Sequence, residues 1–372
     1  MFPREVISTG SLVLRAPVSD DAEAVVKACT DPVTARFLPL LPDPYELSDA
    51  HEYLRQAAAK WDGGGAEFTI TENGQYLGAV GLTAPDRWGS VEIGYLVAPW
   101  ARGKGVASAA ARAVTEWAVD RGVHRVELMA EVENVASLKV ARKAGFTEEG
   151  RRRDAKRLRD GRRTDHITFA RLAHDSGEAV EPYLPFFDGG ELSDGVVSLT
   201  PMEVGDAADF RRMLAEPSVA AYNVGPTGTL EDNERRCRYT GYWWASGQRI
   251  ELAIRDAATG AFAGHIQLVQ IAPVTAQGMV GYSLLPDFRG RGFMTRAVRL
   301  LVDWAFAHTA LHRIVAGTVV TNAASHAVLE RAGFVRESVR RELFPQPDGT
   351  RADDIEWVRL RPSTSRKIPI SG

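Results

Sequence analysis

One long internal repeat constrains this chain of 372 residues more than any other feature of its sequence. The segment VEIGYLVAPWARGKG at 91–105 corresponds to GMVGYSLLPDFRGRG at 278–292. Ordered matches continue downstream to an Ala-Gly-Phe triplet, at 144–146 in the first copy and at 332–334 in the second. Because the period is as long as a whole domain and much longer than a solenoid unit, the sequence predicts two domains of one fold in tandem.

The boundary between the copies is predicted in a segment without hydrophobic periodicity. Residues 174–195 read HDSGEAVEPYLPFFDGGELSDG, and this mixture of Gly, Pro, Asp and Ser is typical of a linker. We therefore expect a first domain at 1–173, a linker at 174–190 and a second domain at 191–372. Each half is long enough to bury a core of its own.

The order of strand and helix patterns within one copy indicates the fold class. The pattern at 67–83 predicts a hairpin that turns at Asn73-Gly74, the strongest short hairpin signal. Helices are predicted at 106–122 and 137–145. The complete order, β-α-α-β-β-β-α-β-α-β-β, predicts the α+β class. Each domain should contain a mixed, mostly antiparallel central sheet flanked by helices.

Composition excludes several classes of partner and site. The formal net charge is only −3, so we expect no binding to nucleic acid and none to a membrane surface. No apolar run is long enough for a transmembrane helix, and no signal-peptide pattern opens the chain. Cys29 and Cys237 lie far apart, so neither a disulfide framework nor a cysteine metal site is expected. We expect a cytoplasmic protein without a metal.

A glycine-rich loop follows the strand predicted at 91–99 and leads directly into a helix. Gly103 and Gly105 would let the backbone approach an anion, and the helix N-terminus favours pyrophosphate. Arg102 and Lys104 add positive charge. The second copy of this loop consists of Arg289, Gly290, Arg291 and Gly292.

The loop alone does not identify its ligand. A tight Gly-rich turn with solvated charges would contain the same residues. A Walker loop is excluded, because no Gly-Lys-[Ser/Thr] follows a GxxxxG pattern. The loop matches a dinucleotide-binding fingerprint only in part, because it follows several strands and does not lie in an opening βαβ unit.

The motifs taken together resemble the GCN5-related N-acetyltransferase superfamily, especially its ribosomal-protein N-terminal acetyltransferase-like branch. Arg102, Gly105 and Ala107 fit the family's R-x-x-G-x-[G/A] coenzyme A loop, whereas the second copy has Met294 at the last position. Both copies also carry the branch's N-x-x-S motif followed by Gly-Phe. The resemblance covers nearly the whole chain. It implies acetyl-CoA as the co-substrate and an amine acceptor, either a small molecule or a protein N-terminus.

The resemblance also implies roles for individual residues. The pantetheine arm would lie along a strand that a bulge splays from its neighbour, with a backbone N–H at Leu96-Val97 meeting the thioester oxygen. Asn134 would bond the coenzyme arm. Ser137 would protonate the leaving thiolate, or would simply cap the next helix. The corresponding residues of the second copy are Leu284, Leu285, Asn322 and Ser325.

The proton acceptor is the point at which the two copies differ most. Glu92 would be a general base acting through water, or an ordinary solvent-facing residue of its strand. The second copy has Met279 at that position, and Met cannot act as a base. His265, in the neighbouring strand, is either a substitute base or a structural residue.

Two further patterns leave alternatives open. The stretch RRRDAKRLRDGRR at 151–163 is either a solvated hairpin or a basic rim that attracts an anionic acceptor. The aromatic run at 239–244 either packs into the core or walls an acceptor pocket.

The leading functional hypothesis is an acyl-CoA-dependent N-acyltransferase that works by direct attack in a ternary complex. The alternative is that one domain is a non-catalytic acyl-CoA-binding module supporting the other. The paired N-x-x-S and Ala-Gly-Phe motifs argue against a nicotinamide dehydrogenase.

Overall fold

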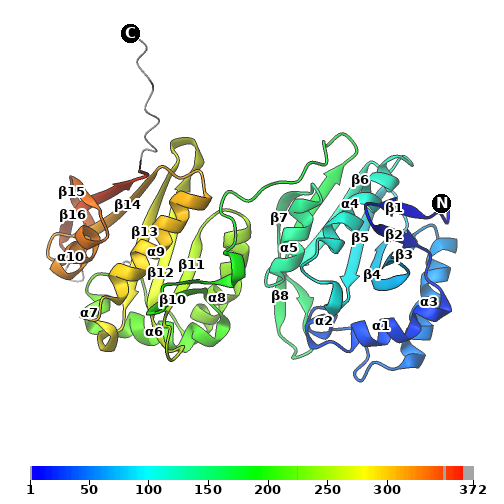
Figure 1. The fold of residues 1–372 in the computed structure, drawn as a ribbon, viewed down its shortest axis with the longest axis horizontal. Coiled ribbons are helices and arrows are strands. Elements are labelled where there is room, and N and C mark those ends of the chain that lie inside the picture. The colour runs from blue at the N-terminus through cyan, green and yellow to red at the C-terminus, as the bar shows by residue number, and fades with distance from the viewer. Residues whose placement is uncertain (1, 224, 347–348, 363–372) are drawn as a thin grey trace, which may run out of the picture. The chain divides into compact units, whose positions relative to one another are not determined.

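The computed structural model describes residues 2–223, 225–346 and 349–362. The chain divides into two compact units, residues 1–181 and 182–372. Figure 1 shows that each unit consists of its own sheet with helices packed on it. Within the described residues, each unit has one sheet of eight strands.

The sheet of the first unit has the strand order β1-β2-β3-β4-β5-β6-β8-β7. Only the neighbours β5 and β6 run parallel, and all other neighbours are antiparallel. The elements of this unit are β1 Ile7–Thr9, β2 Leu12–Arg15, α1 Ala22–Cys29, α2 Pro32–Phe37, α3 Leu47–Asp62, β3 Ala66–Glu72, β4 Gln75–Leu82, β5 Ser90–Val97, α4 Val106–Val119, β6 Arg125–Glu131, α5 Val135–Lys143, β7 Thr147–Arg157 and β8 Arg163–Leu172.

The second unit repeats this order, β15-β16-β14-β13-β12-β11-β10-β9, with β13 and β14 as its parallel pair. The predicted α+β class, with two mostly antiparallel sheets flanked by helices, is confirmed. The elements are β9 Leu192–Ser193, β10 Val197–Pro201, α6 Ala207–Ala215, α7 Pro217–Ala220, α8 Leu230–Ala245, β11 Ile250–Asp256, β12 Phe262–Ala272, β13 Gln277–Leu284, α9 Phe293–His308, β14 Arg313–Val319, α10 Ala323–Arg331, β15 Val335–Pro345 and β16 Arg351–Leu360.

The strands have two different faces because successive side chains of a strand point in opposite directions. In β11, Ile250, Leu252 and Ile254 are buried in a core that includes α9. Ala253 lies between them in sequence and packs into a second core with α6 and α8. The sheet therefore separates α9 from α6 and from Cys237 of α8, whereas Trp244 at the end of α8 packs in the same core as α9.

The segment expected to be a linker is packed against both units. Val180 donates a backbone hydrogen bond to the Arg142 carbonyl in the first unit. Leu184 and Phe187 are buried in the core of the second unit. The Phe187 ring lies edge-on to Trp244, at 4.7 Å between centroids. The break between the units therefore falls at residues 181 and 182.

We predict that fragments 1–181 and 182–372 each fold, because each unit has its own core. A fragment beginning at residue 191 should be less stable than 182–372 by about 4 kcal/mol, since it lacks two buried apolar side chains. Denaturant unfolding followed by circular dichroism measures both. An unfolded 1–181 fragment would show that the units share a core, and equal stability of the two C-terminal fragments would contradict the role of Leu184 and Phe187.

Candidate active site

Strand β5 is paired along one side but only at its beginning along the other. Its residues 93–97 pair with β4, whereas its contact with β6 covers only 90–92. The second unit has the same gap, because β13 pairs with β14 only over 277–279 and continues beside β12 to Leu284. The splay predicted from the sequence is thus present in both units. It leaves backbone hydrogen-bonding groups of β5 and β13 facing an open gap.

The bulge beside each gap lies in the neighbouring strand and not in β5 or β13. Leu77 is the extra residue in β4, and Ala263 is the extra residue in β12. The next residue in each strand is a glycine in close contact with the strand that borders the gap. A Cβ on Gly78 would lie 2.2 Å from the Leu96 carbonyl oxygen, and one on Gly264 would lie 2.4 Å from that of Ser283. Only glycine fits there.

The pairing pattern identifies the N–H groups that point into each gap. Alternate residues of an antiparallel strand bond to the same partner strand. Thr83 donates to the Glu92 carbonyl and Ala98 donates to the Leu77 carbonyl, so Leu96 bonds to β4 and Val97 faces the gap. Of the predicted pair Leu96-Val97, the structure therefore turns only the Val97 N–H into the gap.

The same pattern corrects the assignment in the second unit. Leu285 donates its N–H to the Ala263 carbonyl and is buried, so this N–H is not available to a ligand. Leu284 lies opposite Gly264, as Val97 lies opposite Gly78. The equivalent of Leu96-Val97 is therefore Ser283-Leu284, and the predicted pair Leu284-Leu285 is one residue too late.

The two glycine-rich loops have the same backbone conformation. Gly105 begins α4 with φ 78° and ψ 1°, and Gly292 begins α9 with φ 78° and ψ 2°. Neither helix has a side-chain cap, so its first N–H groups remain open to an anion. Met294, which departs from the family pattern, is buried and does not change the loop.

The four charged side chains of the two loops already have partners within the protein: carboxylates for Arg102 and Arg291, and backbone carbonyls for Lys104 and Arg289. Arg102 contacts Asp31 at 2.6 Å and Thr34 Oγ1 at 2.7 Å, so it joins the loop to the start of α2. Lys104 donates to the Trp100 carbonyl at 3.0 Å. In the second loop, Arg289 donates to the Leu284 carbonyl at 3.1 Å. Backbone N–H groups, Gly103 and Gly290 included, are therefore the main anion-binding groups of these loops.

The N-x-x-S motif forms the start of α5 and of α10. Asn134 Oδ1 accepts from the Ser137 N–H at 3.1 Å, and Asn322 Oδ1 accepts from the Ser325 N–H at 3.1 Å. The asparagine, and not the serine, is thus the N-cap of each helix. The serine hydroxyls are free for another role, which removes the capping alternative.

Each of these serines is hydrogen-bonded to a tyrosine that the sequence analysis did not single out. Ser137 Oγ lies 2.6 Å from the hydroxyl of Tyr95 on β5, and Ser325 Oγ lies 2.8 Å from that of Tyr282 on β13. Burial raises the pKa of both tyrosines, so both stay protonated at neutral pH. The signal was present in the sequence, since both copies contain the same Gly-Tyr dipeptide.

Glu92 lies at the start of the β5 gap on the face opposite the buried Val91 and Ile93. Its N–H donates to Thr83 Oγ1. Among the described residues no group bonds to its carboxylate. Partial desolvation and the neighbouring Glu127 raise the pKa of Glu92. A raised pKa brings a carboxylate closer to the range in which it can accept a proton from an amine.

His265 lies on the corresponding face of the second unit and is buried. Its Nε2 lies 3.7 Å from Glu251 Oε2, and its ring is 4.9 Å from that of Phe210. Glu251 also accepts from Arg236 Nε at 2.8 Å. The matching position of the first unit is Ala79, because Ala79 pairs with Leu96 as His265 pairs with Ser283.

A cavity with a volume of 1480 Å³ follows the gap of the second unit. It joins the loop residues to the N-x-x-S motif and to the face of His265. The predicted site residues that line it are Leu284, Arg289, Gly290, Gly292, Asn322 and Ser325.

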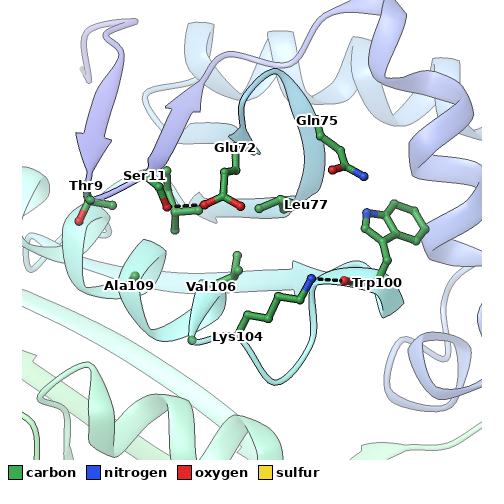
Figure 2. A pocket seen from close by; sticks show the side chains of 12 residues that line it. Thr9, Ser11, Glu72, Gln75, Leu77, Trp100, Lys104, Val106 and Ala109 are labelled. Carbon is green, nitrogen blue, oxygen red and sulfur yellow. Dashed lines mark hydrogen bonds between the residues drawn. The ribbon is translucent and has the colours of Figure 1, made fainter.

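A cavity of 490 Å³ in the first unit lies on another side of the glycine-rich loop. Figure 2 shows Lys104 beside Trp100, and Ser11 bonded to Glu72 at the strand turns. Gly105 lines this cavity, but Glu92, Asn134 and Ser137 do not.

Four of the eight basic side chains at 151–163, in the hairpin of β7 and β8, are paired with acidic neighbours. Lys156 contacts Glu131 at 2.6 Å, and Arg159 contacts Asp43 at 3.0 Å. These pairs favour the interpretation as a structural hairpin over that of an anion-attracting rim.

The aromatic run on α8 is not part of the described cavity. Trp244 belongs to the core, and the Arg249 guanidinium lies 3.5 Å from the centroid of the Trp243 ring. Packing therefore accounts for these aromatic side chains.

Comparison with known proteins identifies relatives of each half. A family model described as an acetyltransferase (GNAT) domain matches residues 11–147 and again residues 197–335. A probable N-acetyltransferase of Bacillus subtilis, YjcK, is 31% identical over 157 residues, which cover 41% of this chain and 87% of that protein.

Among the described residues no helix is long and apolar enough to span a membrane, and no cluster of side chains is suited to a metal.

Solved structures resemble one half of the chain at a time. A ribosomal-protein-S5-alanine acetyltransferase from Vibrio fischeri has 22% identity and a TM-score of 0.44, over 46% of this chain and 97% of that one. The microcin C7 self immunity acetyltransferase MccE, solved in complex with acetyl-CoA and AMP, has 18% identity and a TM-score of 0.42, over 46% of this chain and 99% of that one.

We predict that coenzyme A binds two sites and that each glycine-rich loop controls one. Gly105→Val and Gly292→Val should each remove one site, because a β-branched residue is strained at positive φ and would displace the loop N–H groups. Isothermal titration calorimetry gives the stoichiometry. Gly89→Val is the matched control, since Gly89 also has positive φ (79°) but lies in a turn outside the loop. Loss of a site in this control, or two sites in either loop variant, would contradict the assignment.

Proposed function

Because the chain belongs to the acetyltransferase (GNAT) family, we propose that it transfers an acetyl group from acetyl-CoA to a primary amine by direct attack in a ternary complex. The amine belongs to a small molecule or to a protein N-terminus. The proposal is supported most by one arrangement present in both units. A gap with free backbone N–H groups lies between an open helix N-terminus and a serine–tyrosine pair.

The gap would hold the coenzyme in a defined direction. The pyrophosphate would bind the N–H groups at the start of α4 or α9, where backbone dipoles favour an anion. The pantetheine arm would then replace the missing strand pairing along β5 or β13. The oxygens of Asn134 and Asn322 cap a helix, and their amide nitrogens would bond to this arm. The thioester oxygen would meet the N–H of Val97 or Leu284.

These groups match the changes of charge during the reaction. The amine nitrogen attacks the thioester carbon, and negative charge develops on the oxygen near the Val97 N–H. When the C–S bond breaks, the sulfur takes the electron pair and requires a proton. Ser137 would supply it and would regain a proton from Tyr95, whose hydroxyl is 2.6 Å away. The second unit has the same pair in Ser325 and Tyr282.

The acceptor amine must also lose a proton. Glu92 is our candidate base in the first domain, because its carboxylate is accessible, has no bonded partner among the described residues and has a raised pKa. It lies four residues before Leu96, about 13 Å along the strand at ~3.3 Å per residue. Water must therefore connect it to the reacting nitrogen. The alternative function, a second domain that only binds the coenzyme, is favoured by Met279 at the position of Glu92.

We expect Glu92→Gln to lower the turnover of the first domain roughly 10²-fold, the lower end for a positioned base. The base acts when ionised, so wild-type activity should fall as the pH drops through the raised pKa of Glu92. The variant should lose this part of the pH profile while its affinity for acetyl-CoA stays unchanged. Thiol release by the isolated fragment 1–181, followed against pH and against acetyl-CoA concentration, measures the pH profile and the dependence on acetyl-CoA. Full activity of the variant would exclude Glu92 as the base.

We expect Tyr95→Phe to lower kcat about tenfold without raising the KM for acetyl-CoA, because the substitution removes only the hydroxyl bonded to Ser137. Steady-state kinetics of fragment 1–181 test this. Tyr45→Phe is a matched control, since Tyr45 is buried in the same unit and its hydroxyl bonds to Cys29. An unchanged kcat in Tyr95→Phe, or an equal loss in the control, would contradict a role in proton transfer.

A further inference from the structure

The second domain has an imidazole where the first has only a methyl group. His265 lies on β12 directly opposite Ser283 on β13. Cα atoms of such a hydrogen-bonded pair are about 5.5 Å apart. The next residue, Leu284, directs its N–H into the gap. The gap lies on the far side of β13 from β12, so His265 is about two strand spacings, ~10 Å, from the place proposed for the thioester, and water must connect it to the amine. Glu92 in the first domain is about 13 Å away along its strand.

We propose that the second domain is a separate acetyl-transfer site in which His265 is the general base and Glu251 orients it. This inference rests on the proposed function, since it assigns a base to the same reaction. It replaces the idea that Met279 makes the second domain a binding module. In the second domain Met279 occupies the position that Glu92 has in the first domain. His265 provides a different candidate base, closer to the reacting atoms.

The surroundings of His265 resemble a histidine–carboxylate pair. Glu251 Oε2 lies 3.7 Å from Nε2, which is longer than a hydrogen bond. Nε2 is buried and has no hydrogen-bond partner among the described residues. A small rotation of the ring would bring it to Glu251. The carboxylate would then stabilise the imidazolium that forms when His265 takes a proton.

The charges around the pair keep its two members in suitable protonation states. Arg236 and Arg249 contact the Glu251 carboxylate at 2.8 and 3.1 Å. Burial alone would raise the pKa of Glu251, but its interactions with His265 and Arg236 outweigh burial and lower that pKa. Burial, reinforced by the two arginines, lowers the pKa of His265, so the imidazole is neutral at neutral pH. A neutral imidazole can accept a proton.

One cavity connects His265 with the other proposed groups. Its lining includes Gly292 of the loop, Asn322 and Ser325. The acceptor side of the cavity is also lined by Leu214, Val219, Tyr222, Met279 and Phe344. These side chains favour an acceptor whose amine is attached to an apolar body.

The proton balance of the step is complete within the two substrates, the protein and solvent. The amine nitrogen forms a bond to the thioester carbon and becomes acidic as it does so. His265 takes its proton, and the oxyanion faces the Leu284 N–H. The C–S bond then breaks, the sulfur keeps the electron pair, and Ser325 donates the proton that makes the free thiol. Tyr282, whose hydroxyl lies 2.8 Å from Ser325 Oγ, returns a proton to the serine, and solvent carries the proton of His265 back to Tyr282. The products are an amide and coenzyme A.

The test uses the full chain, acetyl-CoA and two amines, 2-phenylethylamine as the apolar acceptor and spermidine as the polar one. Thiol release is measured in Glu92→Gln, in His265→Gln and in the double variant. We expect Glu92→Gln to retain turnover of 2-phenylethylamine. The double variant Glu92→Gln/His265→Gln should turn over 2-phenylethylamine about 10²-fold more slowly than Glu92→Gln. Its rate should also no longer fall at acid pH. Glu251→Gln should lower it less and shift the acid limb to a different pH.

Controls separate a catalytic effect from a folding defect. Two coenzyme A sites by calorimetry in His265→Gln would show that the second domain is folded. Ser325→Ala in the Glu92→Gln background should also abolish the remaining turnover without altering the buried charges.

The proposal is overturned if Glu92→Gln alone abolishes all turnover, because the second domain would then be inactive. It is also overturned if the double variant is as fast as Glu92→Gln. Absence of thiol release by the wild-type chain with every amine would instead overturn the proposed function itself.

Discussion

The missing strand pairing beside β5 and β13 is the constraint on which both sites depend. A buried backbone N–H without a partner is costly, so a gap in a sheet must be filled by solvent or by a ligand. Here the gap opens after three paired residues, and Gly78 and Gly264 allow close packing of the strand on its other side. An extended ligand with amide groups can complete the ladder. The helix N-terminus at one end then fixes the direction of that ligand.

The duplication preserves the groups proposed to hold the coenzyme and changes the side chains on the acceptor face. The gaps, the conformations of the two loops, the asparagine caps and the serine–tyrosine pairs agree between the units. On the acceptor face, by contrast, Glu92 corresponds to Met279 and Ala79 to His265. A coenzyme common to both domains needs the first set. Two different acceptors, or two different ways of removing a proton, need the second.

The sequence predicted the two-domain fold because a domain-length repeat and hydrophobic periodicity are local signals. It did not locate everything in the site. Leu285 was predicted as part of the second pair, although the repeat itself aligns 96–97 with 283–284, and the pairing shows that the Leu285 N–H is already bonded. Tyr95 was overlooked because its partner Ser137 is 42 residues away in the chain. Phe187 was likewise predicted to lie in the linker, because its contacts with Trp244 and Trp304 join residues that are far apart in the chain.

A carboxylate on the acceptor face is common to both units, buried in the case of Glu251 and half-buried in the case of Glu67, and its partners determine what it can do. Glu67 lies opposite Gly81 as Glu251 lies opposite Gln267. Lys60 holds Glu67 at 2.8 Å, and the glycine is needed because a Cβ there would meet that pair. A charge held away from water must be paired, and in the first unit Lys60 and the Tyr53 hydroxyl, 2.9 Å from Glu67 Oε1, meet this demand. In the second unit Arg236 bonds to both oxygens of Glu251 and Arg249 contacts Oε1, while the His265 imidazole lies 3.7 Å from Oε2. The same structural requirement thus produces an inert ion pair in one domain and a proton-accepting pair in the other.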